Sequence, residues 1–250
     1  MTRRQLRFGT IALLVVALIW FLYVHRSKPT PVEITAEPGH HLTLENEYVR
    51  VFKMELGPNA SSLLHYHRHD YIYVSLGISE VENDVAGKSS VKLTLQDGET
   101  HFVPGGFAHV TKNLSDRPFR NLTIELLQDE KARQSPPPNR GANGNGANGN
   151  EDRGLEVLNG GTSDILFVND GVRVSQLDLQ PGGILPKHHH AGPHLIVAVT
   201  DLELRSDIEG SAPAQIQIKA GDVDWINGDT THALTNIGKQ DAKLITIEFP

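Results

Sequence analysis

The chain contains no cysteine among its 250 residues, and only 6% of them are aromatic. The lack of thiols excludes disulfide bonds, thiolate metal sites and cysteine nucleophiles. Positive charge is also scarce, because 23 lysines and arginines face 30 acidic residues and no basic block follows the first few positions. The composition therefore gives no indication of a nucleic-acid partner. Histidine, with 13 copies, is the abundant reactive residue type.

One apolar run stands at the N-terminus. Three arginines precede an apolar stretch over residues 8–24, and Arg26 and Lys28 follow it. This pattern predicts a transmembrane signal anchor over residues 1–30, with the bulk of the chain in the periplasm or outside the cell. No small-residue cleavage site follows Tyr23, which favours an uncleaved anchor over a signal peptide that would release a secreted form.

A second segment of unusual composition divides the remainder of the chain. Residues 129–153 are prolines, then Gly/Asn repeats, then charge, and they predict a disordered linker. The segments on its two sides, residues 40–128 and 154–250, consist of short β-branched runs broken by Gly, Pro, Asn and Asp. We therefore expect two all-β domains.

The two domains are copies of one another. A shift of 123 residues lays "VRVFKMEL" from Val49 on "VRVSQLDL" from Val172, with no gap before the C-terminal strands. The same shift carries three histidines of the first domain onto three of the second: His65, His67 and His109 fall on His188, His190 and His232. Such coincidence at one fixed period indicates a duplicated domain whose histidines share a structural position.

The spacing of the histidines indicates a metal site in each domain. Side chains alternate across a strand, so His188, His190 and His194 share one face while His189 points to the other. If each sheet closes into a barrel, the inward imidazoles of separate strands converge as neutral nitrogen donors. The predicted ligands of a divalent metal are His188, His190, His194 and His232 in the second domain and His65, His67 and His109 in the first.

These residues resemble the two half-motifs of the cupin superfamily. The pattern G-x5-P-x-G-x2-H-x3-N is matched in full by "GETHFVPGGFAHVTKN", from Gly98 to Asn113. In the second domain Asn227-Gly228-Asp229 replaces P-x-G, and in the first domain Asn59 stands where a glycine is expected, although Asn tolerates a left-handed backbone. The resemblance implies a bicupin: two tandem double-stranded β-helix (jelly-roll) barrels, here preceded by one transmembrane helix.

The departures from the family pattern bear on function. Where the family carries a carboxylate ligand, this sequence has Tyr71 in the first domain and His194 in the second. A four-nitrogen site would leave the full charge of a divalent ion for an anionic substrate or an oxygen species. Tyr71, a candidate catalytic residue, can ligate the metal, bind substrate or pack, and His69 is a further candidate ligand. Asn113 and Asn236 are expected to fix the backbone.

Two functions follow from the resemblance and the ligand set. The first is a metal-dependent oxidoreductase, dioxygenase-like, that acts on a small organic molecule outside the cytoplasm; cupins also include isomerases, decarboxylases and lyases. The second is a non-catalytic, membrane-tethered module that binds a metal or a small ligand. The nitrogen donors suit Fe, Zn, Mn, Ni or Cu. The resemblance also implies either a monomer with paired barrels or a homodimer.

Overall fold

The computed structural model describes residues 30–128, 154–169 and 172–250. Strands make up most of these ranges, with one short 3-10 helix, η1 (Ile34–Ala36). The all-β prediction is therefore confirmed. The predicted anchor lies almost wholly outside the described residues, and the predicted linker lies wholly outside them. No helix within the described ranges is long and apolar enough to cross a membrane.

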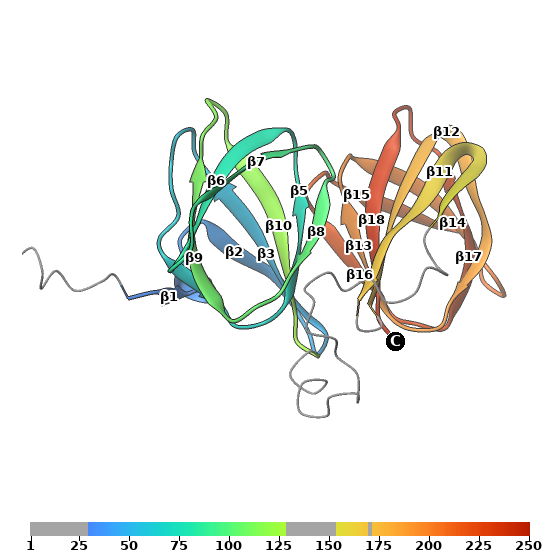
Figure 1. Cartoon of the computed structure of the whole chain (residues 1–250). Helices are drawn as coiled ribbons and strands as arrows, with labels where there is room; N and C mark the ends of the chain where they lie inside the picture. Colours follow the sequence, from blue (N-terminus) through green and yellow to red (C-terminus); the bar gives the residue numbers. More distant parts are fainter. Residues whose placement is uncertain (1–29, 129–153, 170–171) are drawn as a thin grey trace, which may run out of the picture. The chain divides into compact units, whose positions relative to one another are not determined.

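Ten strands form the first barrel (Figure 1). They are β1 (Val32–Glu33), β2 (His40–Glu45), β3 (Val49–Leu56), β4 (His65–His67), β5 (Tyr71–Ser75), β6 (Ser79–Val85), β7 (Val91–Leu95), β8 (Thr100–Val103), β9 (Phe107–Asn113) and β10 (Phe119–Leu126). One sheet has the order β1-β4-β9-β6-β7 and the other the order β2-β3-β10-β5-β8. The two sheets enclose the barrel interior.

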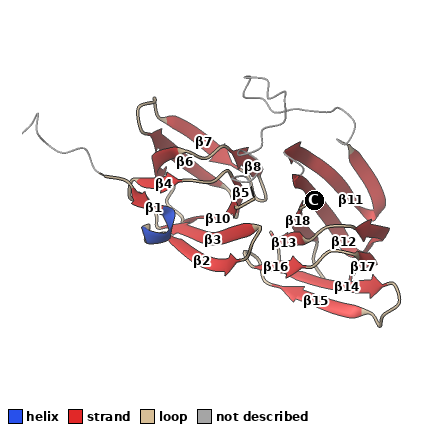
Figure 2. Cartoon of the chain, turned by 90° about the horizontal axis from the view of Figure 1, so that it is seen from below, coloured by secondary structure: helices blue, strands red, loops and turns tan. Residues whose placement is uncertain are grey.

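Eight strands form the second barrel (Figure 2). They are β11 (Leu155–Asn169), β12 (Val172–His190), β13 (His194–Ala198), β14 (Leu202–Ile208), β15 (Ala214–Ile218), β16 (Val223–Ile226), β17 (Thr230–Asn236) and β18 (Ala242–Glu248). Their order is β15-β14-β17-β12-β18-β13-β16, and β11 pairs with β12. The long β12 pairs with β18 through its first half and with β17 through its second half, so it joins the two sides of the barrel.

The strand registers confirm the internal duplication. His65 lies opposite His109 across β4 and β9, and His188 lies opposite His232 across β12 and β17. Both pairs are related by the 123-residue shift, as are the β3–β10 and β12–β18 pairings. The domain boundaries at 40–128 and 154–250 stay predictions.

Apolar and polar side chains alternate along β10, so the outer face of this strand is apolar and its inner face carries polar groups. Leu122 and Ile124 are fully buried in an apolar cluster that also contains Val197 and Ile245 of the second barrel. The alternate residues of β10, Asn121 and Thr123 among them, line a cavity inside the first barrel. Because this strand buries apolar side chains on its outer face, its inner face is free to carry polar groups.

Two turns adopt a left-handed backbone without glycine. Asn59 has a φ of 55°, at the position that Gly182 occupies in the second barrel with a φ of 79°. Asp229 has a φ of 59°, at the position equivalent to Gly106, whose φ is 87°. Asn and Asp accept this conformation more readily than other residues with a side chain. Both departures from the glycine pattern therefore keep the same turn.

Two equivalent asparagines fix the ends of their strands. The amide of Asn113 donates to the carbonyls of Leu56, Gly57 and Arg117, and its oxygen accepts from Ser115. In the second barrel the amide of Asn236 donates to Leu179 O and Gln240 O, and its oxygen accepts from Gly238 N. Each side chain is only 1% exposed, and the expected backbone role is confirmed.

Replacing either asparagine is expected to destabilise its barrel. Asn113→Ala and Asn236→Ala each leave buried backbone groups without partners, and we expect the free energy of unfolding to fall by about 3 kcal/mol. Urea unfolding followed by circular dichroism measures the loss. Asn227→Ala, at an exposed position, is the control and should change stability by less than about 0.5 kcal/mol. Equal stability of all three variants would contradict the backbone role.

Candidate metal centres

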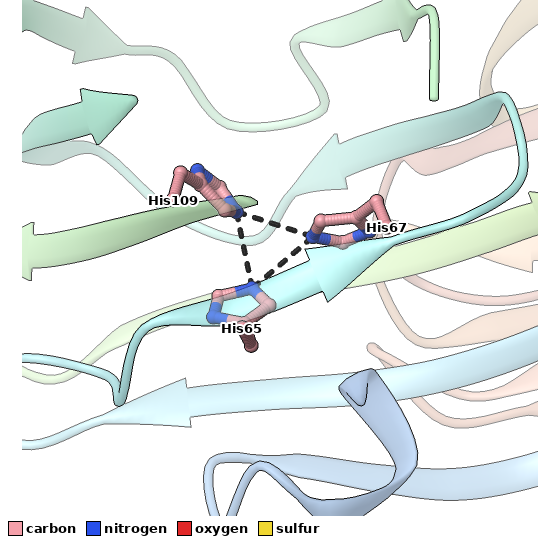
Figure 3. Close-up of side chains that lie close together, drawn as sticks. All are labelled: His65, His67 and His109. Atoms are coloured by element: carbon pink, nitrogen blue, oxygen red, sulfur yellow. Dashed lines mark hydrogen bonds between the residues drawn. The ribbon is translucent and has the colours of Figure 1, made fainter. Parts of the chain in front are cut away.

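Three imidazoles meet inside the first barrel. His65 and His67 extend from β4 and His109 extends from β9, and their Nε2 atoms point toward one another (Figure 3). The three Nε2–Nε2 distances are 3.1, 3.1 and 3.0 Å. The three residues are 0%, 1% and 6% exposed. We call this group the first histidine cluster.

The spacing of these nitrogens suits a metal ion. An ion about 2.0–2.1 Å from each nitrogen, with ligand angles of roughly 90–110°, requires nitrogens about 2.9–3.4 Å apart. The observed distances lie within that range. His65 Nδ1 lies 2.9 Å from the carbonyl of Leu63 and donates to it, which leaves the lone pair of His65 Nε2 facing the other two rings. A shared cation would satisfy all three nitrogens at once.

The second barrel holds an equivalent group. His188 and His190 of β12 and His232 of β17 form the second histidine cluster. Nε2 of His188 lies 2.9 Å from that of His190 and 3.1 Å from that of His232. In both clusters the ligand atoms of the three histidines lie within 4.8 Å of one another.

Partners at the far ring nitrogens orient the second cluster. His188 Nδ1 lies 2.8 Å from the carbonyl of Pro186, and His232 Nδ1 lies 2.8 Å from the hydroxyl of Ser206. His190 Nδ1 lies 3.2 Å from Glu248 Oε1, although this contact does not have the geometry of a hydrogen bond. Partners of this kind fix the orientation of a metal-binding imidazole. Ser206 was not expected from the sequence.

Two residues predicted for the sites lie beside the clusters. The ring of His194 stacks on His190, with centroids 4.1 Å apart, and it does not join the three converging nitrogens. Tyr71 stacks on His67 in the same way, with centroids 4.2 Å apart. The structure thus brings together three of the four nitrogens expected in the second barrel. His194 and Tyr71 occupy equivalent places as stacking partners of a ligand candidate.

Burial lowers the pKa of several of the clustered histidines. It lowers the pKa of His65 to about 4 and that of His109 to about 3, with repulsion from neighbouring histidines adding to the shift of His109. In the second barrel burial lowers the pKa of His232 to about 4. A neutral imidazole is the form that donates a lone pair to a metal. His65, His109 and His232 are therefore in the metal-binding protonation state at neutral pH.

A cavity adjoins the first cluster. It has a volume of about 40 Å³ and contacts His67, His109 and Tyr71. A water molecule needs about 10–15 Å³ of such volume, so the cavity accommodates several waters or a molecule of a few heavy atoms. Its remaining wall mixes apolar and polar side chains, among them Thr111 and Asn121.

Sequence reasoning missed one pair of residues at this cavity. His40 of β2 lines it, and His40 Nδ1 lies 2.7 Å from a carboxylate oxygen of Glu37, which directly follows η1. The equivalent positions in the second barrel are Gly160 and Ser163. The repeat therefore gave no signal for this pair, and its i, i+3 spacing alone does not identify a site.

The barrels and their inward histidines define the class of this protein: the chain has the cupin fold, in two copies, with two histidine sites that suit a divalent metal. It is similar to oxalate decarboxylase from Bacillus subtilis, with 16% identity and a TM-score of 0.58, over 84% of this chain and 74% of that chain. The Bacillus enzyme has Mn(II) centres.

A further solved structure has the same fold. AerE from Microcystis aeruginosa matches with 14% identity and a TM-score of 0.54, over 84% of this chain and 97% of that chain. No protein-family model and no curated protein sequence matches the chain. At these identities the similarity establishes the cupin fold and leaves the reaction open.

Metal content tests the two clusters separately. We expect the full-length chain to retain about two Co²⁺ ions after desalting, and His67→Ala and His190→Ala to retain about one each, because each variant loses one of three converging donors. Elemental analysis gives the stoichiometry. His189→Ala is the matched control, since this exposed neighbour bonds Thr231 and should leave both ions bound. Two ions in His67→Ala would rule out the first cluster.

The lowered pKa values predict how the stability of the metal-free chain depends on pH. The unfolded chain takes up protons near pH 6.5, whereas folded His65, His109 and His232 resist protonation down to about pH 4 or 3. The unfolded state therefore binds more protons in this window, and stability should fall as pH drops from about 6.5 to 4.

Thermal unfolding of the EDTA-treated chain at several pH values measures this slope. His109→Leu removes one of the resisting groups and should give a shallower slope between the same pH limits. A stability that stays constant from pH 6.5 to 4 would show that these rings are not held neutral.

Proposed function

We propose that this protein is a metal-dependent enzyme, a dioxygenase-like oxidoreductase, that acts on a small organic molecule outside the cytoplasm. The observation that carries the proposal is the first histidine cluster, because two of its three buried histidines, His67 and His109, line a cavity of about 40 Å³. A structural metal site is usually closed by four protein ligands, whereas three ligands beside a cavity leave positions for substrate. The cavity and the set of three donors together favour a catalytic metal site over a structural one.

The donor set defines what a bound ion would supply. Three neutral imidazoles add no negative charge, so a divalent ion held there acts as a Lewis acid toward an anionic or chelating ligand and can bind oxygen. The residues that would hold it are His65, His67 and His109 in the first barrel, and the corresponding triad in the second.

Tyr71 acts in this proposal by positioning and by hydrogen bonding. Its ring stacks on His67 and lines the cavity. Burial raises the pKa of its hydroxyl well above the usual value, so the group keeps its proton at neutral pH. Tyr71 is thus suited to donate a hydrogen bond to an oxygen atom of the substrate and is a poor general base.

The proposed location rests on the sequence. The apolar run over residues 8–24, with arginines before it, favours a membrane tether that leaves both barrels outside the cytoplasm. In the same proposal the domains span residues 40–128 and 154–250, joined by the Pro/Gly/Asn linker. Such a tether would hold the metal centres near the membrane surface.

A non-catalytic module is the second candidate. Neither histidine cluster includes a carboxylate, and His188 in the second is only partly buried. Two similar nitrogen sites on one chain suit a protein that binds or scavenges a metal or small ligand. The oxidoreductase is favoured because the first cluster has a cavity beside it, which storage of an ion does not require.

Turnover by the metal-loaded full-length chain distinguishes these functions. Oxygen uptake and carbon dioxide release are measured with diketones, phenolic acids, thiols and oxalate. We expect oxygen-dependent turnover of at least one class, lowered at least about a hundredfold by His67→Ala and unchanged by His189→Ala. Carbon dioxide release without oxygen uptake would replace the oxidoreductase with a decarboxylase. Two bound ions with no turnover would support the binding module.

A further inference from the structure

A buried carboxylate and a buried imidazole form a fixed pair in the wall of the first barrel. Glu37 is 3% exposed and His40 is 8% exposed. Glu37 Oε2 lies 2.7 Å from His40 Nδ1 and also accepts from Gly39 N at 2.8 Å, and Oε1 accepts from Leu63 N at 3.1 Å. A carboxylate with three donors holds its orientation more firmly than an exposed one.

This network assigns the proton on the His40 ring. Burial opposes ionisation of Glu37, yet the hydrogen bonds from His40 and Leu63 bring its pKa down to about 2. An ionised carboxylate only accepts hydrogen bonds, so His40 Nδ1 carries the hydrogen. In a neutral ring Nε2 then carries the lone pair. Nδ1 is the only atom of this ring with a hydrogen bond in the described part of the chain.

The same network reaches the first histidine cluster. The carbonyl of Leu63 accepts from His65 Nδ1, while the amide of Leu63 donates to Glu37. The ring of His40 lies 4.9 Å from that of His65 and 6.2 Å from that of His67, centroid to centroid. Glu37 therefore orients His40 directly and is linked through one residue to a metal-ligand candidate.

A ligand in the cavity would contact His40. His40 lines the cavity together with His67 and His109, two members of the first cluster. A molecule bound in this cavity therefore lies against both the His40 ring and members of the cluster. The second barrel has Gly160 and Ser163 in place of the pair, so this arrangement distinguishes the first centre from the second.

We infer that His40, oriented by Glu37, is a substrate-binding residue that selects small hydroxylated molecules at the first centre. The inference deepens the proposed function and rests on it. One oxygen of such a molecule would bind the ion that the three histidines would hold. Its hydroxyl group would donate a hydrogen bond to His40 Nε2. A hydroxy acid of two or three carbons meets both requirements and suits the size of the cavity. A simple carboxylate offers no hydrogen to this lone pair and gains nothing from it.

Glycolate and acetate are matched probes for this selection, because they carry the same charge and differ by one hydroxyl group. The parent protein is the full-length chain with His190→Ala and His232→Ala, so that bound Co²⁺ reports on the first cluster alone. The visible absorption of the Co²⁺-loaded protein is titrated with each anion. We expect the parent to bind glycolate about tenfold more tightly than acetate.

Substitutions at the pair should remove the preference and leave the metal bound. In the parent, His40→Leu should lower glycolate affinity about tenfold without changing acetate affinity, and His40→Asn should restore part of the loss through its amide oxygen. Glu37→Gln should lower the preference with His40 still present, because it no longer fixes the ring hydrogen. His41→Leu, at the exposed neighbouring position of β2, is the matched control and should behave as the parent.

The outcomes separate this inference from the function on which it depends. A parent that binds no Co²⁺ would overturn the proposed function, and the inference with it. A parent that binds Co²⁺ but prefers glycolate equally with and without His40 would overturn the inference alone. Loss of both anions together in Glu37→Gln and His40→Asn, with Co²⁺ retained, would also contradict selection of the hydroxyl. Thermal unfolding of each variant verifies that it is folded.

Discussion

Antiparallel pairing places a histidine opposite a histidine in each barrel, and both candidate centres depend on that register. His65 faces His109 across β4 and β9, and His188 faces His232 across β12 and β17. Directly opposed side chains lie about 4.5–5.5 Å apart at Cβ, close enough for two rings to aim at one point. A shift of one residue in either pairing would send one imidazole to the other face.

The centres also require a barrel interior that tolerates polar groups. The sheet opposite the first cluster buries apolar side chains of β3, β5 and β10 on its outer face, in a hydrophobic cluster that also contains residues of the second barrel. Burial there stabilises the sheet, so the interior does not have to supply the main apolar core. Histidine, threonine and asparagine can therefore line the cavity. Low solvent exposure inside then keeps the histidines neutral.

The duplication produced two centres that now differ in their surroundings. Each retains three histidines and a stacked ring, Tyr71 in one and His194 in the other. The first is buried and adjoins both a cavity and the Glu37–His40 pair. In the second, Glu248 contacts His190 instead. The two clusters have the same metal donors but different neighbouring residues. The two centres can therefore have different functions on one chain.

The sequence by itself determined the β class, the duplication and the six histidines of the two clusters, because alternation and a fixed repeat period are local properties of the chain. It also indicated the backbone roles of the two strand-end asparagines. Only the tertiary structure showed that His194 stacks on His190 and that His40, paired with Glu37, lies at the first centre. These contacts depend on which strands become neighbours and on how ring planes pack, and that information is spread over residues distant in the chain.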